Sequence, residues 1–572
     1  MSYHSGLLAL LGASLAATMA ACGGGGSDAT TSALRNTSLG IVQGADDSTS
    51  GTVSWKGIPF AQPPVGALRW KAPADPTPWS SPLVATRFGN ACLQNGRIYG
   101  PGTNNTYDAT IGTTLNTPVG SEDCLTLNVW APAGTSSTAK LPVIFFVYGG
   151  SNISGYSADP VYNGAALAKT ANAVVVSANY RVGPLGFFNM AQLKGGTDAA
   201  EDSGNFALLD IIKALKFVKS NAEVFGGDSG NVTLMGQSAG AINVYALLTS
   251  PLATGLFHKA VPLSGGISLA SNLPAGTIPT LNPATTYAAQ SSALLTKLLI
   301  ADGKATDATS AAAYIATQTK AQIADYMRAK AGGTLLTTLL TAGLTGSGPI
   351  PDGTVIPTDP IAAFSAGHYN KMPILAGNTA EEGKLFAAFL SLLGGPAGFK
   401  ITDATRFSMM MNFNPDAPAT ITENDIIDPA YVPSNTPVTG YTAKTTLLGN
   451  IFIIASRDNV LNAIKSQQTN LWYYQFAWAQ EPAPWNTVYG AAHAFDLPFI
   501  FGNFGPSLFS NAANSTANKP GRLALSAAMM ASIGAFARNG DPNNSAVGVT
   551  WPAWPAKLMF DATPTAAHIT VQ

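Results

Sequence analysis

The chain has 572 residues, of which 46% are hydrophobic and 11% are charged. A typical soluble protein has about 25% charged residues, so this composition favours a large buried core. The 30 Lys and Arg residues nearly balance the 31 Asp and Glu residues, which leaves a net charge of −1. Without a basic surplus, neither nucleic acid nor an anionic membrane surface is expected as a partner.

The first segment has the features of an export signal. Residues 7–21 form an apolar run that ends in Met-Ala-Ala before Cys22 and is too short to cross a bilayer. Small residues before a single cysteine, with a Gly- and Ser-rich stretch after it, resemble the lipobox of bacterial lipoproteins. We therefore predict a lipoprotein-type signal peptide at 1–21, a lipidated Cys22 and a flexible tether at 22–38. The alternative is an ordinary secretory signal with an incidental cysteine.

The cysteine count agrees with export. The chain has three cysteines, so a lipidated Cys22 would leave Cys92 and Cys124 as a pair. A disulfide between them can persist in an exported protein. So few cysteines and histidines make a structural zinc site unlikely to form, and no metal is expected. The predicted location is the cell envelope, as an outer-membrane or periplasm-facing lipoprotein, or otherwise outside the cell. The membrane is expected as a partner only through this anchor.

Apolar runs and helical patterns alternate along the folded domain, which is predicted to span residues 39–572. The runs at 141–148 and 173–179 are typical of strands buried on both faces of a mostly parallel sheet. Residues 206–222 place apolar side chains at helical spacing. This alternation predicts an α/β fold with a large, mostly parallel sheet flanked by helices.

A helical insertion is predicted at residues 281–346, which are rich in Ala, Thr and Leu and poor in charge. These helices would lie over the sheet. They would serve either as a lid or acyl pocket, or as a purely structural subdomain.

The turn at residues 236–240 has the sequence Gly-Gln-Ser-Ala-Gly, between a short predicted strand at 232–235 and a predicted helix at 241–249. It matches the G-x-S-x-G turn of α/β-hydrolases, in which small neighbours let the chain turn sharply and expose the serine oxygen. The helix N-terminus would stabilise negative charge that develops beside Ser238. Ser238 is therefore the predicted nucleophile.

A serine nucleophile needs a general base, which is usually histidine. Of the five histidines, His493 lies on a small-residue loop after a strand-like segment. The others lie in the leader, in a charged helix-like stretch (His258), ahead of the strand that would carry the acid, and in the tail. His493 is therefore the predicted base by elimination. Glu381 and Glu382 both follow a predicted strand at 372–377, and spacing alone does not choose between them as the acid.

Backbone amides are expected to hold the oxyanion of the reaction. One is the amide of Ala239, directly after the nucleophile. The others lie in the loop Gly149-Gly150-Ser151, which follows the apolar run at 141–148.

Further segments resemble the type-B carboxylesterase/lipase family of the α/β-hydrolase superfamily, which also holds cholinesterases and the non-catalytic neuroligins. The similarity extends from Leu39 to the C-terminal region. It rests on GIPFAQPPVGALRW (57–70), SEDCLTLNVWAP (121–132), NYRVGPLGFF (179–188), GNFALLD (204–210) and FGGDSGNVTLMGQSAG (225–240).

The resemblance implies a Ser-His-Glu triad and favours Glu382 over Glu381 as its acid. It also implies a first disulfide, a structural ion pair, an oxyanion hole and a buried serine behind the triad. The residues at the matching positions are Ser238, Glu382 and His493 for the triad, Cys92 and Cys124, Arg69 and Glu122, Gly150, Ser151 and Ala239, and Ser264.

The chain departs from the family pattern at three points. Ser151 stands where a third glycine is usual, and Gln237 replaces the commoner glutamate beside the nucleophile. Between Cys92 and Cys124 there is no Trp, whereas cholinesterases use a Trp there to hold a quaternary ammonium. A choline ester is therefore not expected as substrate.

These residues predict a carboxylic ester hydrolase that acts through an acyl-enzyme, without metal or organic cofactor. Its expected substrates are uncharged esters of small to medium size. The alternatives are a lipase that acts on longer acyl chains and a neuroligin-like binding protein. The sequence does not indicate an oligomeric state.

Overall fold

A computed structural model of the chain describes residues 33–344 and 347–572. The predicted signal peptide, Cys22 and most of the predicted tether lie outside these ranges. The folded unit begins at Ala33. Residues Leu34–Thr37, predicted to be tether, form strand β1 and pair antiparallel with β2 (Gly40–Gln43). Backbone pairing with β2 orders these residues. Such pairing does not need apolar side chains, so this polar segment gave no signal of a strand.

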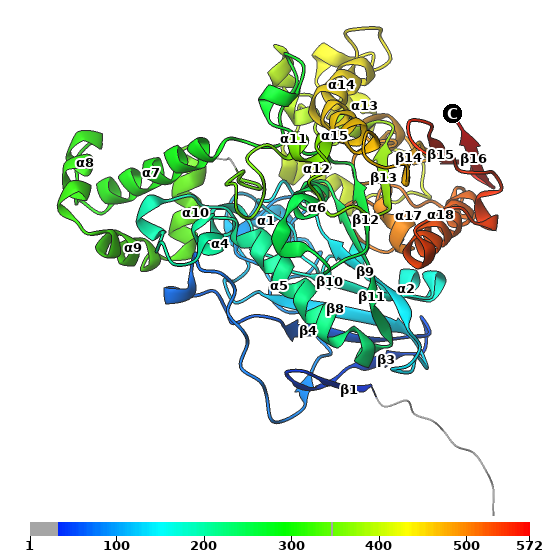
Figure 1. Cartoon of the computed structure of the whole chain (residues 1–572). Helices are drawn as coiled ribbons and strands as arrows, with labels where there is room; N and C mark the ends of the chain where they lie inside the picture. The colour runs from blue at the N-terminus through cyan, green and yellow to red at the C-terminus, as the bar shows by residue number, and fades with distance from the viewer. Residues whose placement is uncertain (1–32, 345–346) are drawn as a thin grey trace, which may run out of the picture. The chain divides into compact units, whose positions relative to one another are not determined.

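An 11-stranded sheet forms the centre of the folded unit, in the order β16-β15-β14-β13-β12-β11-β9-β10-β8-β4-β3 (Figure 1). The strands from β15 to β10 run parallel to their neighbours, and antiparallel strands complete both edges. This confirms the predicted large, mostly parallel sheet. The strands are β3 (Ala45–Asp47), β4 (Thr52–Pro59), β8 (Thr126–Pro132), β9 (Leu141–Val147), β10 (Val174–Ala178), β11 (Gly227–Gln237), β12 (Lys259–Leu263), β13 (Ile374–Thr379), β14 (Leu471–Phe476), β15 (Leu558–Ala562) and β16 (Ala567–Val571).

Two small sheets lie outside the large one. In the first, β2 pairs with β1 and with β5 (Leu83–Val84). The second contains β6 (Gln94–Asn95) and β7 (Pro118–Val119).

Helices cover both faces of the large sheet. On one face α18 packs against α2 and α17 and contacts β9 and β11, while α5 and α6 contact β11 from the other face (Figure 1). The predicted helices at 206–222 and 241–249 correspond to α5 and α6. Outside the helical insertion, the α-helices are α1 (Thr110–Thr114), α2 (Ala165–Ala171), α3 (Gly183–Gly186), α4 (Ala199–Asp202), α5 (Phe206–Asn221), α6 (Ala239–Thr249), α11 (Pro360–Ser365), α12 (Asp403–Met411), α13 (Glu423–Ile426), α14 (Tyr441–Gly449), α15 (Ala455–Lys465), α16 (Trp485–Val488), α17 (Leu497–Phe501) and α18 (Lys519–Asn539).

The prediction of a helix-like stretch around His258 was wrong. His258 directly precedes strand β12, and its backbone amide donates to the Val232 carbonyl at 2.7 Å. Pairing of β12 with β11 outweighs the local pattern, because the neighbouring strand satisfies the backbone hydrogen bonds of this buried segment.

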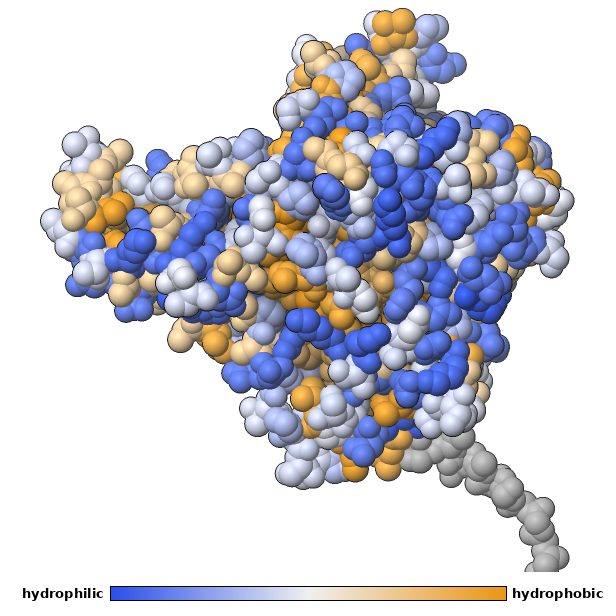
Figure 2. Space-filling model, viewed as in Figure 1, coloured by the Kyte–Doolittle hydropathy of each residue, from blue (hydrophilic) through white to orange (hydrophobic). Residues whose placement is uncertain are grey.

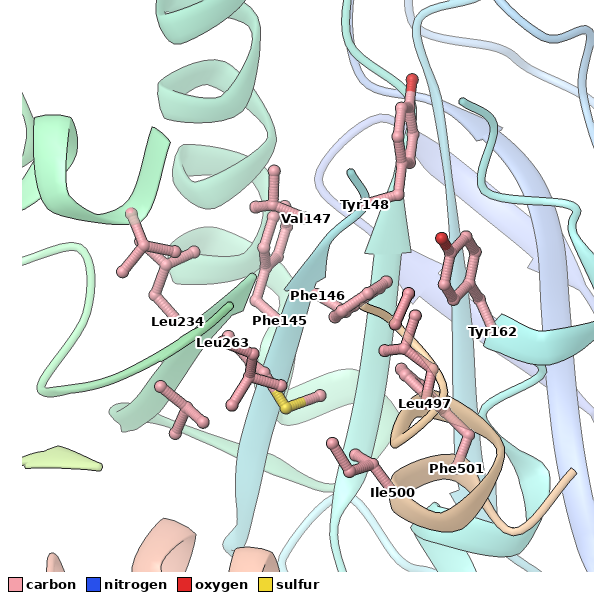
Figure 3. Close-up of a cluster of buried hydrophobic side chains, with 14 of the residues drawn as sticks. Phe145, Phe146, Val147, Tyr148, Tyr162, Leu234, Leu263, Leu497, Ile500 and Phe501 are labelled. Carbon is pink, nitrogen blue, oxygen red and sulfur yellow. The ribbon is translucent and has the colours of Figure 1, made fainter. Parts of the chain in front are cut away.

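Strand β9 runs through the middle of the hydrophobic core. Its residues Phe145 and Phe146 are fully buried, and Figure 3 shows them among side chains from β11, β12 and α17. Burying one such side chain contributes roughly 1.5–3 kcal/mol. The continuous apolar run is therefore explained by burial on both faces of the sheet.

The predicted helical insertion contains four helices, which we call the helical arm (Figure 1). They are α7 (Ala284–Ala301), α8 (Ala308–Thr317), α9 (Lys320–Arg328) and α10 (Gly332–Thr341). Their buried leucines share a second hydrophobic cluster with residues of the sheet-containing body, among them Trp70 and Phe188. Residues 345–346, at the end of the predicted insertion, lie outside the described part of the chain.

Figure 2 shows hydrophilic and hydrophobic residues interspersed over the face in view. Within residues 33–344 and 347–572, no helix is both long and apolar enough to cross a bilayer.

The structure contains the predicted disulfide between Cys92 and Cys124, which are 32 residues apart in sequence. A cross-link over a loop of this length restricts the unfolded chain and contributes about 3–4 kcal/mol on the chain-entropy treatment. We expect the double variant Cys92→Ala/Cys124→Ala to lose this amount in its free energy of unfolding, measured with urea. Wild-type protein unfolded with urea in the presence of reductant should lose about the same free energy of unfolding. A loss below about 1 kcal/mol in both would contradict the prediction.

Candidate active site

Ser238 lies in a tight turn between strand β11 and helix α6. Its backbone has φ +59° and ψ −123°, a conformation that is unfavourable for a residue with a side chain. The turn requires glycine on both sides. A Cβ atom on Gly236 would lie 2.4 Å from the Gly240 carbonyl oxygen, and one on Gly240 would lie 2.1 Å from the Val147 oxygen. The Ser238 amide donates to the Leu263 carbonyl at 2.8 Å, which holds the turn against β12.

His493 and Glu382 form a buried pair. The His493 Nδ1 atom lies 2.5 Å from Glu382 Oε2, and each residue is only 2% exposed. Since an ionised carboxylate can only accept a hydrogen bond, Nδ1 is the donor in this contact. The Phe386 ring packs against the imidazole with 4.8 Å between ring centroids. This arrangement fixes both the orientation and the tautomer of the ring.

Three donors hold the second oxygen of Glu382. Oε1 accepts hydrogen bonds from Ser264 Oγ at 2.7 Å, Asn378 Nδ2 at 2.9 Å and the Thr379 amide at 2.8 Å. Burial raises the pKa of the Glu382 carboxyl, but His493 and the hydrogen bonds lower it more, so the pKa lies below its ordinary value. The carboxylate is therefore ionised at neutral pH.

Gln237 contacts the other side of the imidazole. Its Nε2 atom lies 3.1 Å from His493 Nε2, and the Gln237 side chain is 2% exposed. With the proton on Nδ1, the Gln237 amide donates to Nε2. A glutamate at this position could not donate to the neutral ring.

Ser238 and His493 face the same cavity, which encloses about 400 Å³ of empty space with the solvent at its mouth included. The remaining lining is largely aromatic and apolar, and none of it comes from the described residues of the helical arm. The other lining residues are Tyr99, Gly149, Gly150, Ser151, Tyr162, Gln237, Leu385, Phe386, Ala494 and Phe509.

The glycine-rich loop after β9 forms one wall of this cavity. Gly150 has φ +115° and Ser151 has φ +57°. The Gly150 carbonyl accepts from the amides of Ile153 and Ser154 at 3.0 and 3.1 Å, which folds the loop back on itself. In the described part of the chain, the amides of Gly150, Ser151 and Ala239 donate to no protein acceptor. The Ser151 side chain lies near the Tyr99 hydroxyl, whose pKa burial raises and Ser151 lowers.

The structure also brings together the predicted ion pair, at a distance from the cavity. Arg69 Nη2 lies 2.5 Å from Glu122 Oε1. The same guanidinium donates through Nη1 to the carbonyls of Arg328 and Lys330 at 3.0 and 2.5 Å. The pair therefore links the disulfide loop to the helical arm.

Several site residues were missed by the sequence interpretation. Asn378, which bonds Glu382, carries a weak signal as a polar residue at the end of a predicted buried strand. Phe386 and Tyr99 carry none, because their positions depend on loop conformation. Asp496 also gave no signal in the sequence. It accepts a hydrogen bond from the Tyr474 hydroxyl at 2.7 Å, and burial raises its pKa to about 6. Among the described residues, no group of three or more His, Cys, Asp and Glu side chains is placed to hold a metal ion.

Glu481 is a further buried carboxyl group, within electrostatic reach of Glu381 and Lys384. It is 4% exposed, and within the described residues neither of its carboxyl oxygens has a hydrogen-bond partner. Burial raises its pKa to about 8, and Glu381 adds to this effect, whereas Lys384 opposes it. The folded protein therefore holds this proton more tightly than the unfolded chain, whose glutamates have pKa values near ~4.3.

Because of this difference in pKa, Glu481 should destabilise the folded state at high pH. The folded state binds more protons than the unfolded state between about pH 4 and 8, so stability falls as pH rises through this window. We expect Glu481→Gln to gain stability over wild type by up to about 1.4 kcal/mol per pH unit within it. Urea unfolding at several pH values measures the difference, with the exposed Glu223→Gln as control. A difference that does not change with pH would disprove the interpretation.

The arrangement of a sharp turn at a serine, a buried imidazole–carboxylate pair and a mostly parallel sheet can be compared with known proteins. The model of the "Carboxylesterase family" matches residues 31–563. The para-nitrobenzyl esterase of Bacillus subtilis (strain 168) is 30% identical over 533 residues, covering 91% of this chain and 92% of its own. The fumonisin B1 esterase of Sphingopyxis macrogoltabida is 32% identical over 479 residues, covering 83% of this chain and 76% of its own. A solved PNB esterase structure superposes with a TM-score of 0.68 at 27% identity, covering 94% of this chain and 96% of its own.

The protein therefore has the α/β-hydrolase fold, as predicted. Its relatives are named esterases and carboxylesterases, which makes it a serine carboxylesterase. The chain belongs to the carboxylesterase family.

Proposed function

We propose that Ser238, His493 and Glu382 form the catalytic triad of this esterase. The observation that carries the proposal is the continuous set of contacts from Ser264 through Glu382 to His493, whose ring faces the cavity that also contains Ser238. His493 Nε2 takes the proton as Ser238 Oγ bonds to the ester carbonyl carbon. Glu382 stabilises the resulting imidazolium. His493 then protonates the leaving alcohol, and water attacks the acyl-enzyme to release the acid.

The amides of Gly150, Ser151 and Ala239 would hold the oxyanion of each tetrahedral intermediate. They lie beside the nucleophile and have no acceptor within the described chain. Ser151 replaces a glycine of the family pattern, but the proposed donor is its backbone amide, which glycine and serine share. Each such donor supports the rate by about 10²–10³-fold in related chemistry.

We propose uncharged esters of small to medium size as substrates. Much of the cavity lining is aromatic or aliphatic, and the described residues that line it include no Asp, Glu, Lys or Arg to meet a charged substrate. Hydrolysis of p-nitrophenyl esters from acetate to palmitate tests this. The ratio kcat/KM should be highest for short or medium acyl chains. A maximum at palmitate would overturn the assignment.

A lipase acting on longer chains is the second candidate, and one observation favours it. Phe389 and Leu392, which closely follow the cavity residue Phe386, are 51% and 65% exposed. The Phe389 ring lies 6.4 Å from the ring of Phe386, and exposed apolar residues next to a cavity residue can contact lipid. Activity on emulsified triglyceride that rises sharply above its solubility would favour this candidate.

We also propose export with a lipid anchor at Cys22, which would place the enzyme at the cell envelope. The Cys92–Cys124 disulfide supports export, because disulfides persist in oxidising compartments. Release of the protein from membranes on Cys22→Ala substitution tests the anchor. Equal membrane association of both forms would refute it.

A further inference from the structure

A second cavity, which we call the arm cavity, encloses about 660 Å³ of empty space, with the solvent at its mouth included. Its lining comes from helices α7 and α10 of the arm on one side and from loops of the body on the other. The wall is largely apolar, with Phe187, Phe188, Leu336, Leu339 and Leu340.

The arm cavity is a separate space from the catalytic cavity, because the two share no lining residue in the described chain. The same two segments nevertheless contribute to both. Arg97 and Ile153 line the arm cavity, whereas Tyr99 and Ser151, two residues away in each segment, line the catalytic cavity. The segments therefore form a thin partition between the two spaces.

One positive charge faces this apolar space. Arg97 is the one Lys, Arg, Asp, Glu or His among the described residues that line the arm cavity. Its Nη1 donates to the neutral Asn116 amide oxygen at 3.2 Å, and within the described residues it has no acidic partner. Other arginines differ in this respect. Arg69 and Arg181 lie 2.5 and 2.7 Å from carboxylates that compensate their charge.

We propose that the arm cavity binds an amphipathic carboxylate with an alkyl chain of medium length. The carboxylate would pair with the Arg97 guanidinium, whose planar donors suit a carboxylate. The alkyl chain would lie against Phe187 and the leucines of α10. An apolar wall can accept many kinds of ligand. An amphipathic carboxylate also compensates the positive charge of Arg97. The proposal concerns binding only and does not depend on the proposed reaction.

Titration calorimetry of the purified protein with decanoate and with decanol tests the charge recognition. We expect decanoate to bind at least about 10-fold more tightly than decanol, since hydrogen bonds to charged groups discriminate by about this much or more. Arg97→Gln should abolish the preference while leaving decanol binding unchanged, which shows that the variant keeps its cavity. Arg87→Gln, at an exposed arginine, is the matched control and should bind as wild type.

A second pair of variants tests the location. Leu340→Trp places a larger side chain in the cavity from a half-buried position and should weaken both ligands about 10-fold or more. Thr337→Trp, on the exposed side of the same helix, should leave the affinity for both ligands unchanged. Ser238→Ala should bind decanoate as wild type. The proposal is overturned if decanoate does not bind, if it binds no better than decanol, or if Arg97→Gln and Leu340→Trp leave its affinity unchanged.

Discussion

Replacing Ser238 with alanine is expected to lower kcat for p-nitrophenyl acetate by about 10⁶-fold, as in serine hydrolases whose nucleophile is removed. The remaining activity would come from substrate binding and from the oxyanion donors alone. Alanine keeps a small side chain in the strained turn, so the fold should be unaffected. The rate of p-nitrophenol release, followed by stopped-flow or steady-state absorbance, gives kcat. Thermal unfolding checks that the variant is folded.

Ser136→Ala is the matched control, because Ser136 is exposed and distant in sequence from every site residue. It should retain full activity. A folded Ser238→Ala protein with more than about a hundredth of wild-type kcat would rule out Ser238 as the nucleophile, given the size of the loss that nucleophile removal causes.

The second large effect is expected for Glu382→Gln, with a loss of about 10⁴-fold in kcat by analogy with neutralising a triad acid. Glutamine cannot stabilise the imidazolium, and its amide nitrogen would present a donor to His493 Nδ1 and favour the wrong tautomer. The pKa of Glu382 lies below its ordinary value, so the group is ionised throughout the neutral range. Wild-type activity should therefore not be limited by Glu382 protonation until the pH falls below the usual glutamate range.

Glu381→Gln provides a matched control one residue away. Glu381 contacts Lys384 at 2.7 Å and accepts from the Ala491 amide at 3.0 Å, and it does not contact His493. We expect this variant to lose less than about 10-fold in kcat, since it removes no charge from the triad. If the two variants lost activity to the same extent, or if Glu381→Gln lost more, Glu382 would not be the acid.

The same two glutamates show where sequence reasoning ends. The strand before them is recognisable from its apolar run, and its carboxyl end is the right place for an acid. Neighbouring residues on a loop point in different directions, however, and the direction depends on the backbone of the turn. Here Glu382 begins a short 3-10 turn, Glu382–Lys384, and points into the core, while Glu381 points toward Lys384. Only the family resemblance favoured Glu382 beforehand.

Elements with a strong local pattern were predictable. The apolar run at 141–148 became β9, and the helical pattern at 206–222 became α5 (Phe206–Asn221), because burial decides both. Strand β11 begins before the predicted strand at 232–235, because Gly227 pairs with Leu141 of β9; the pairing resumes at Val232 after an irregularity that has no signal in the sequence. Contacts such as Gln237 with His493, 256 residues apart, have no local signal at all.

The order of strands in the sheet has a consequence for how activity arises. Ser238, Glu382 and His493 follow β11, β13 and β14, and β12 lies between the first two of these strands. Over 250 residues separate the first of these side chains from the last. Loop closure over such distances is slow, and contacts of this kind form late when a chain folds. If these residues form the proposed triad, a newly made molecule has no functioning centre until the four adjacent strands β11 to β14 have assembled, and the appearance of turnover reports assembly of this part of the sheet.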